Sequence, residues 1–320
     1  MQFVEKMLKG DLRSLARLIT YIENRSEKLP EIMKAIHNKL GNAYIVGVTG
    51  PPGAGKSTAA DQLISLWRKD DSRVAAVLID PSSPFTGGAI LGDRIRMNRH
   101  TLDPGVYMRS LGSRGHQGGL SRSTKEVVHL LDAYGTDWVL VETVGVGQTE
   151  LDVMEVADTV IVVLGPESGD TVQTMKAGIM EISDIFVVNK ADREGADKMA
   201  AMLKAMLDLK DKEENSWEPP VLLSVASTGR GIDEIQREIQ KHRRFQIDRD
   251  IMRKKKKNIR INEFIEVFDN YFINNLKEAM KSGQLRDLVE KVENGEISPY
   301  EVLEKFKKNG DFSKLLLPKK

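Results

Sequence analysis

Short apolar runs recur along the middle of the chain, and each is rich in β-branched residues. Seven such runs occupy residues 43–49, 73–79, 105–111, 138–142, 159–165, 185–189 and 220–224. Amphipathic stretches with helical periodicity lie between most of them, as at 57–69, 123–134 and 231–242. Continuously apolar strands that alternate with helices predict a mostly parallel sheet with helices on both faces. In such sheets, ligands bind in the loops beyond the carboxyl ends of the strands.

The two ends of the chain have helical patterns. Near the amino terminus, apolar residues recur with helical spacing at Leu8, Leu12, Leu15, Ile19 and Ile22. After residue 246 a basic segment at 253–257 leads into a helix with an apolar stripe of Ile261, Phe264, Ile265, Phe268 and Phe272. A short helix is expected at 296–306, with Pro299 in its first turn. We therefore predict an N-terminal helical extension (1–42), an α/β domain (43–246) and a C-terminal helical arm (247–320).

Composition excludes several classes of function. The 320 residues are 40% hydrophobic and 30% charged, with a net charge of +1, so no field over the whole surface favours nucleic acid or an anionic membrane. Cysteine is absent, which removes disulfides, thiolate metal sites and a cysteine nucleophile. We see neither a signal-peptide pattern nor an apolar run of membrane-spanning length, and we expect a cytoplasmic protein.

A phosphate-binding motif follows the first strand directly. It consists of Gly50, Pro51, Pro52, Gly53, Ala54, Gly55, Lys56 and Ser57, with Thr58 opening the next helix. This strand, glycine-rich loop and helix form a complete P-loop, in which backbone N–H groups and the helix N-terminus hold phosphates. Lys56 is expected to bridge the β- and γ-phosphates, and the Ser57 hydroxyl to ligate Mg²⁺. The context makes a chance glycine-rich turn a poor alternative, and the fold class is that of a P-loop NTPase.

Acidic residues at the ends of two other strands complete the predicted phosphate site. Glu142 closes the fourth strand and would lie near the metal or its waters, while the Gly145 N–H would sense the γ-phosphate. Asp80 and Asp93 follow the second strand and are candidate Mg²⁺ ligands, or alternatively helix caps. Gln148 is comparable to a water-orienting glutamine, although a structural role is equally open. The predicted catalytic residues are thus Lys56, Asp93, Glu142 and Gln148, and the predicted metal ligands are Ser57, Asp80, Asp93 and Glu142.

A second motif selects the base. Asn189, Lys190 and Asp192 follow the apolar strand at 185–189, and the Asp192 carboxylate can accept hydrogen bonds from the N1–H and 2-amino groups of guanine. Adenine lacks both donors, so it would leave a desolvated carboxylate unpaired. Ser224, Val225 and Ala226 follow the last strand and could offer backbone N–H groups to the guanine O6. The predicted ligand is GTP with Mg²⁺; comparable affinity for ATP would instead indicate an ATPase or a kinase.

Longer segments resemble one family. VTGPPGAGKST, DPSSPFTGGAILGDRIRM, ETVGVGQTE and MKAGIMEISDIFVVNKAD are similar to the MeaB/ArgK family, the methylmalonyl-CoA mutase-associated GTPases. This resemblance implies a slow GTPase and a homodimer joined by C-terminal helices. It also implies a partner, an adenosylcobalamin-dependent acyl-CoA mutase such as methylmalonyl-CoA mutase, whose cofactor loading or removal the GTPase gates and which it protects from inactivation. A cobalamin adenosyltransferase is a further candidate partner.

The resemblance also implies a switch segment at 165–176. Arg94, Arg96, Asp170 and Lys176 are the candidates for coupling nucleotide state to the partner, against the alternative of ordinary surface charge. The chain departs from the family here, because the family pattern is similar to PGAGDELQ and this chain has Pro166-Glu167-Ser168-Gly169-Asp170-Thr171-Val172-Gln173.

Other functions are less well supported. No cobalamin-binding signature is present, so we expect cobalamin to be bound by the partner and not by this chain. The basic segment at 253–257 is better explained as a solvated helix start than as a nucleic-acid site. Two alternatives remain: a kinase that phosphorylates a transport-related periplasmic binding protein, and a nucleotide-dependent switch without useful hydrolysis.

Overall fold

The computed structural model describes residues 1–80, 98–112, 122–143, 153–167, 178, 180–209, 216–281 and 285–309. Within them the chain divides into two compact units, Met1–Met252 and Arg253–Lys320. The N-terminal extension therefore belongs to the same unit as the sheet. The boundary that we predicted after residue 246 falls inside a helix, α10 (Ile232–Asp248).

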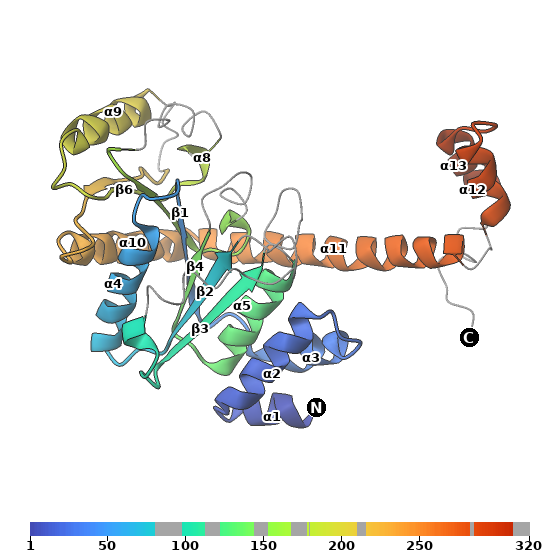
Figure 1. Ribbon diagram of the computed structural model, residues 1–320, viewed down its shortest axis with the longest axis horizontal. Helices are drawn as coiled ribbons and strands as arrows, with labels where there is room; N and C mark the ends of the chain where they lie inside the picture. Colours follow the sequence, from blue (N-terminus) through green and yellow to red (C-terminus); the bar gives the residue numbers. More distant parts are fainter. Residues whose placement is uncertain are drawn as a thin grey trace. The chain divides into compact units, whose positions relative to one another are not determined.

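A seven-stranded sheet forms the centre of the first unit (Figure 1). Its strands are β1 (Tyr44–Thr49), β2 (Val74–Asp80), β3 (Val106–Gly112), β4 (Trp138–Glu142), β5 (Thr159–Leu164), β6 (Ile185–Val188) and β7 (Val221–Leu223). All pairings are parallel, in the order β3-β2-β4-β1-β5-β6-β7. Each strand lies within one of the seven predicted apolar runs except β2 and β3, which extend one residue further.

Helices cover both faces, which is why the strands are apolar at successive positions. On β4, Val139 and Val141 pack into one core cluster, whereas Trp138 and Leu140 pack into the other. The first cluster includes residues of α5 (Arg122–Tyr134) and α9 (Ala196–Asp208), and the second includes residues of α4 (Lys56–Lys69) and α10. The fold is thus a P-loop-type α/β sandwich, as the sequence predicts.

The N-terminal helices extend the first of these clusters. They are α1 (Gln2–Leu8), α2 (Leu12–Glu23), α3 (Leu29–Ile36) and η1 (His37–Lys39), and α2 packs on α5. Leu15, Ile19 and Ile22 are fully buried, but Leu8 and Leu12 are 37% and 46% exposed. The predicted helical extension is present but divided here, because the chain turns at Gly10 (φ +91°) and a new helix begins after Asp11, whose carboxylate accepts a hydrogen bond from the Ser14 N–H.

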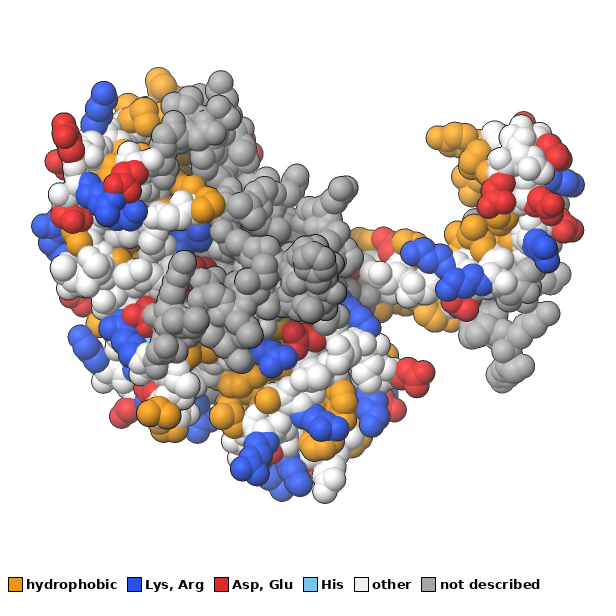
Figure 2. Space-filling view, viewed as in Figure 1, with side chains coloured by type: hydrophobic (Ala, Val, Ile, Leu, Met, Phe, Trp, Pro, Cys, Tyr) orange, Lys and Arg blue, Asp and Glu red, His pale blue; other side chains and the backbone are white. Residues whose placement is uncertain are grey.

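The second unit is helical. It contains most of α11 (Ile251–Lys281), together with α12 (Arg286–Glu293) and α13 (Pro299–Asn309). The basic segment at 253–257 lies inside α11, and Pro299 occupies the first position of α13. The predicted apolar stripe of α11 is exposed, with Phe264 at 61% and Phe268 at 44%. Hydrophobic side chains are visible along this helix in Figure 2. Among the described residues, no helix combines the length and apolarity needed to cross a membrane.

Three short helical segments complete the described elements. They are η2 (Asn98–His100), which precedes β3, η3 (Val153–Glu155), which precedes β5, and α8 (Met180–Ile182), which precedes β6.

Candidate nucleotide-binding site

The loop between β1 and α4 requires glycine at two positions. Gly50 has φ +134°, and a Cβ atom there would lie 2.0 Å from the Val163 carbonyl oxygen on β5. Gly55 has φ +94°, and a Cβ atom there would lie 2.2 Å from the Asn189 side-chain nitrogen. Both positions combine left-handed backbone with close approach to another segment, so no other residue fits without displacement. The P-loop is therefore built against the two neighbouring strand ends.

Lys56 and Ser57 open α4 and are both buried. The Lys56 ammonium donates to the carbonyl oxygens of Gly50, at 2.8 Å, and Pro51, at 3.1 Å, so its charge lies over the loop. With the helix N-terminus, it gives this loop the positive charge that favours an anion. Thr58 follows on the exposed side of the helix.

Two strand ends meet beside Ser57. Its hydroxyl donates to the Glu142 carboxylate at the end of β4, at 2.6 Å, and Glu142 is itself buried. The Thr49 and Thr143 hydroxyls are 2.8 Å apart and join the ends of β1 and β4. A hydroxyl and a carboxylate oxygen side by side next to an anion cradle are the donors that Mg²⁺ prefers. The residues present therefore fit this metal.

Asn189 connects the predicted base site to the P-loop. It is buried, its side-chain amide donates to the Ala54 carbonyl at 2.9 Å, and its backbone N–H donates to the Leu164 carbonyl at 2.8 Å. Its side-chain oxygen accepts bonds from the Ala226 N–H, at 2.9 Å, and the Ser224 hydroxyl, at 3.1 Å. One side chain thus ties three loops together. The base motif and the phosphate cradle belong to one site.

The loop at 224–226 contacts Asn189, and its predicted contact with the guanine O6 stays a prediction. Each of its backbone N–H groups already has a protein acceptor: Ser224 donates to Val188, Val225 to Arg230 and Ala226 to Asn189. Donation to the guanine O6 would require one of these bonds to change. In this structure the loop braces Asn189.

Several predicted residues lie outside the described part of the chain. They are Asp93, Arg94, Arg96, Gly145, Gln148, Asp170 and Lys176, together with the side chain of Asp80.

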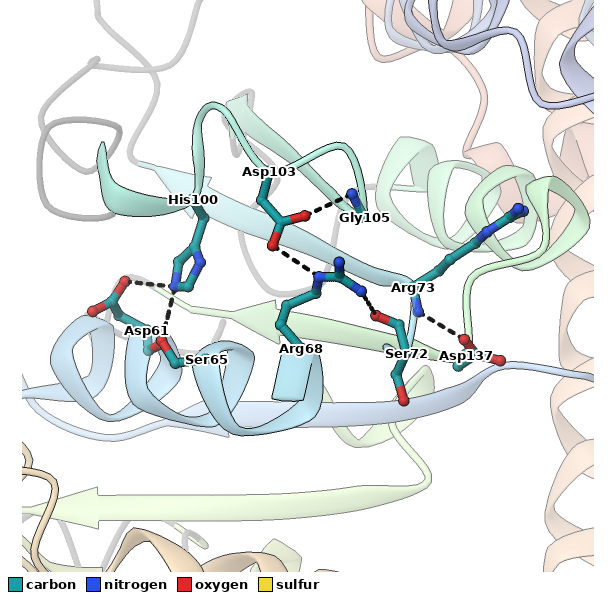
Figure 3. Close-up of polar contacts among 9 residues, drawn as sticks. All are labelled: Asp61, Ser65, Arg68, Ser72, Arg73, His100, Asp103, Gly105 and Asp137. Carbon is teal, nitrogen blue, oxygen red and sulfur yellow. Dashed lines mark hydrogen bonds and ion pairs between the residues drawn. The ribbon is translucent and has the colours of Figure 1, made fainter. Parts of the chain in front are cut away.

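Polar contacts that we did not predict hold α4 against the segments leading into β3 (Figure 3). The His100 Nε2 lies 3.2 Å from the Ser65 hydroxyl and 3.1 Å from an Asp61 carboxylate oxygen. Arg99 forms an ion pair with the same carboxylate, at 2.5 Å. Because α4 begins with Lys56 and Ser57, these contacts fix the orientation of the helix that carries the two residues predicted to contact phosphate and metal.

Arg68, near the carboxyl end of α4, makes a second set of contacts with the segment before β3 (Figure 3). Arg68 donates to the Asp103 carboxylate, at 2.8 Å, and to the Ser72 carbonyl, at 2.7 Å. The hydrogen bond from Arg68 lowers the pKa of the Asp103 carboxyl below its ordinary value, and the Gly105 N–H bond acts in the same direction. These pairs cannot be predicted from a local motif. The partners lie on different segments of the sequence, as with Asp61 and His100 or Arg68 and Asp103.

Comparison with known proteins gives one consistent family. Residues 15–281 match the family model described as methylmalonyl-CoA mutase-associated GTPase MeaB. A relative from Pyrococcus abyssi is 50% identical over 302 residues, covering 93% of each chain. GTPase ArgK of Escherichia coli is 38% identical over 239 residues, covering 72% of each.

Two further comparisons extend the range of relatives. The mouse protein named methylmalonic aciduria type A homolog, mitochondrial, is 33% identical over 255 residues, which cover 73% of this chain and 61% of the mouse protein. A crystal structure of a LAO/AO transport system kinase has a TM-score of 0.70 at 26% identity, covering 96% of each chain.

Proposed function

Because the chain belongs to the MeaB family of methylmalonyl-CoA mutase-associated GTPases, we propose that it binds GTP with Mg²⁺ and hydrolyses it slowly to GDP and phosphate. One observation carries the proposal at the level of the site. Asn189 links the P-loop at Ala54 to the loop that bears Asp192, so a phosphate cradle and a carboxylate suited to guanine are parts of one structure. A nucleotide spanning the two would be held at both ends.

The chain's own residues provide positioning and charge. The P-loop N–H groups and the Lys56 ammonium bind the phosphates, and Lys56 exchanges its two carbonyl acceptors for phosphate oxygens. Ser57 and Glu142 are the residues that would hold Mg²⁺, which supplies positive charge to the phosphate oxygens when bound. Slow intrinsic turnover is the expectation that the family resemblance carries, and a partner could accelerate it.

Nucleotide titration tests this function. We expect the protein to bind GTP and GDP in the presence of Mg²⁺ and to bind ATP far more weakly, as measured by calorimetry. Asp192→Ala should reduce affinity for GTP and leave affinity for ATP unchanged, because only guanine has donors for the carboxylate. Equal affinity of the wild type for GTP and ATP would contradict guanine selectivity.

A kinase is separated from a GTPase by following the γ-phosphate. With GTP labelled at that position, the proposal expects free phosphate; label that remains on a protein would support the kinase alternative.

We further propose that nucleotide state controls an adenosylcobalamin-dependent acyl-CoA mutase, and that two copies of this chain associate through the exposed stripe of α11. The family description supports the first point and the exposed apolar side chains support the second. Purified methylmalonyl-CoA mutase should co-elute with the protein in one nucleotide state more than in the other. Identical elution with GDP and with a non-hydrolysable GTP analogue would contradict control by nucleotide.

A further inference from the structure

The turn after β5 lies against the loop that carries the base motif. Residues 165–167 leave the strand beside that loop, and a Cβ atom on Gly195 would lie 3.8 Å from the Pro166 side chain. Glu167, in this turn, forms ion pairs with Lys190, at 3.2 Å, and with Arg193. A single carboxylate therefore binds two cations of the base loop, although it comes from a different strand end.

The geometry of the base loop explains why both cations reach Glu167. Residues 190–193 form a turn closed by a 2.9 Å hydrogen bond from the Arg193 N–H to the Lys190 carbonyl, and Lys190 has φ +60°. The first and fourth residues of such a turn come together, and Asp192 lies between them in sequence. In the described part of the chain, the Asp192 side chain forms no hydrogen bond or ion pair with protein, and it is exposed.

This arrangement matters because Asp192 has cationic neighbours on both sides. Arg193 is adjacent to it and Lys190 is two residues away, and both side chains are long enough to reach a neighbouring carboxylate. A guanidinium bound to Asp192 would occupy the oxygens that the N1–H and 2-amino groups of guanine need. Glu167 binds both cations and leaves the Asp192 oxygens available.

We propose that Glu167 is a specificity-determining residue of the guanine site, which acts by withholding Lys190 and Arg193 from Asp192. This inference rests on the proposed function, since it assumes that Asp192 reads guanine. Glu167 lies in the segment where this sequence differs from the family pattern, and the inference assigns a role to it. Glu167 does not itself contact the base, so it is a positioning residue.

The effect is expected to be moderate, because the pairs are exposed. The side chains of Glu167 and Arg193 are 57% and 47% exposed, and that of Lys190 is 28% exposed. Exposed ion pairs change an equilibrium by about two- to fivefold, and salt screens them. Loss of these ion pairs should therefore change the affinity for GTP by about the same factor.

The test compares nucleotide affinities of four variants of the full chain by calorimetry. Glu167→Gln should lower the affinity for GTP and GDP about two- to fivefold and leave the affinity for ATP unchanged. The ratio of GTP affinity to ATP affinity then falls. Maximal turnover at saturating GTP should stay the same while KM rises. High salt should reduce the difference from wild type.

The double variant Glu167→Gln/Arg193→Gln distinguishes competition from a general loss of structure. If Arg193 competes for Asp192, removing its charge restores part of the lost GTP affinity, although Lys190 remains; a structural defect would leave the affinity as low as in Glu167→Gln. Arg193→Gln alone should bind GTP as tightly as wild type. Glu278→Gln, which breaks a more exposed carboxylate–ammonium pair with Lys281 in the second unit, is the control for loss of a surface charge and should have no effect.

Two results would overturn the inference. One is an unchanged ratio of GTP to ATP affinity in Glu167→Gln; the other is a double variant that binds GTP as weakly as Glu167→Gln does. Failure of the proposed function is a separate outcome, since wild-type protein would then show no preference for GTP over ATP.

Discussion

Single residues join the two halves of the site. Asn189 uses its side chain to bond Ala54, Ser224 and Ala226, and Lys56 places its charge over the loop carbonyls. Both side chains are at least nine-tenths buried, and both motifs were recognised from sequence. Their partners could not be recognised in the same way, because carbonyl and N–H groups are present at every position.

Lys56 should be essential for turnover. Lys56→Ala removes the cation that neutralises charge on the transferred phosphate, and we expect single-turnover GTP hydrolysis at saturating nucleotide to fall by at least about a hundredfold. The measurement is phosphate release. Lys69→Ala, at the exposed last position of α4, is the control and should behave as wild type. A rate within a factor of two of wild type in Lys56→Ala would contradict the site assignment.

Asn189 should be important for stability as well as for binding. Asn189→Ala loses three side-chain hydrogen bonds and leaves buried groups unpaired, so the free energy of unfolding should fall by roughly 2–3 kcal/mol. Urea unfolding followed by tryptophan fluorescence measures it. Ser224→Ala removes one of the three bonds and should cost about 1 kcal/mol or less. Equal losses in the two variants would contradict the central role of Asn189.

At the scale of elements, α4 both carries residues of the candidate site and packs into the core. It begins at the phosphate ligands, packs Leu63, Ile64 and Trp67 into the core, and is clamped by His100 and Asp103 on the segment before β3. The buried face of α4 can be predicted from helical periodicity. The contacts of α4 with His100 and Asp103 cannot, because β2 separates the two segments in the sequence.

Acid should weaken the ion pair between Arg68 and Asp103. The folded-state pKa of Asp103 lies below the ordinary 3.8, so its contribution to stability is fully present above that value and is lost as pH falls through the lower, folded-state pKa. Thermal unfolding should show Asp103→Asn less stable than wild type at neutral pH. The two should converge as the pH falls from 3.8 through the lower, folded-state pKa of Asp103. A difference that does not shrink as the pH falls below 3.8 would contradict this.

At the scale of the whole molecule, the second unit presents an apolar surface. Ile261, Phe264, Ile265, Phe268 and Phe272 are between 38% and 61% exposed on α11. Burying such a stripe against a second copy would remove it from water. This supports the proposed homodimer.

Charge placed in the stripe should separate the two copies. We expect wild-type protein to sediment as a dimer and Phe268→Lys as a monomer, because an ammonium in an apolar interface loses its hydration. Leu102→Lys alters an apolar side chain that is 94% exposed in the first unit and should remain dimeric. Dimeric Phe268→Lys would place the interface elsewhere.

The sequence by itself determined where the strands lie and which motifs the chain carries. All seven strands were predicted within one residue at each end, because strands buried on both faces must be apolar throughout. The P-loop and the base motif were recognisable because their functions demand particular residues at fixed spacing. The basic segment at 253–257 was predicted as a helix start, and it lies in the first two turns of α11, because lysine and arginine are good helix formers.

Only the tertiary structure decided what lies next to what. The sheet order β3-β2-β4-β1-β5-β6-β7 brings Ser57 to Glu142, 85 residues away, and Asn189 to Ala54, 135 residues away. It also brings Glu167 to Lys190 and Arg193, an ion-pair set that no local pattern encodes. Periodicity reports whether a residue is buried, but the identity of its partner depends on how the strands are ordered, and that order is a property of the packed sheet as a whole.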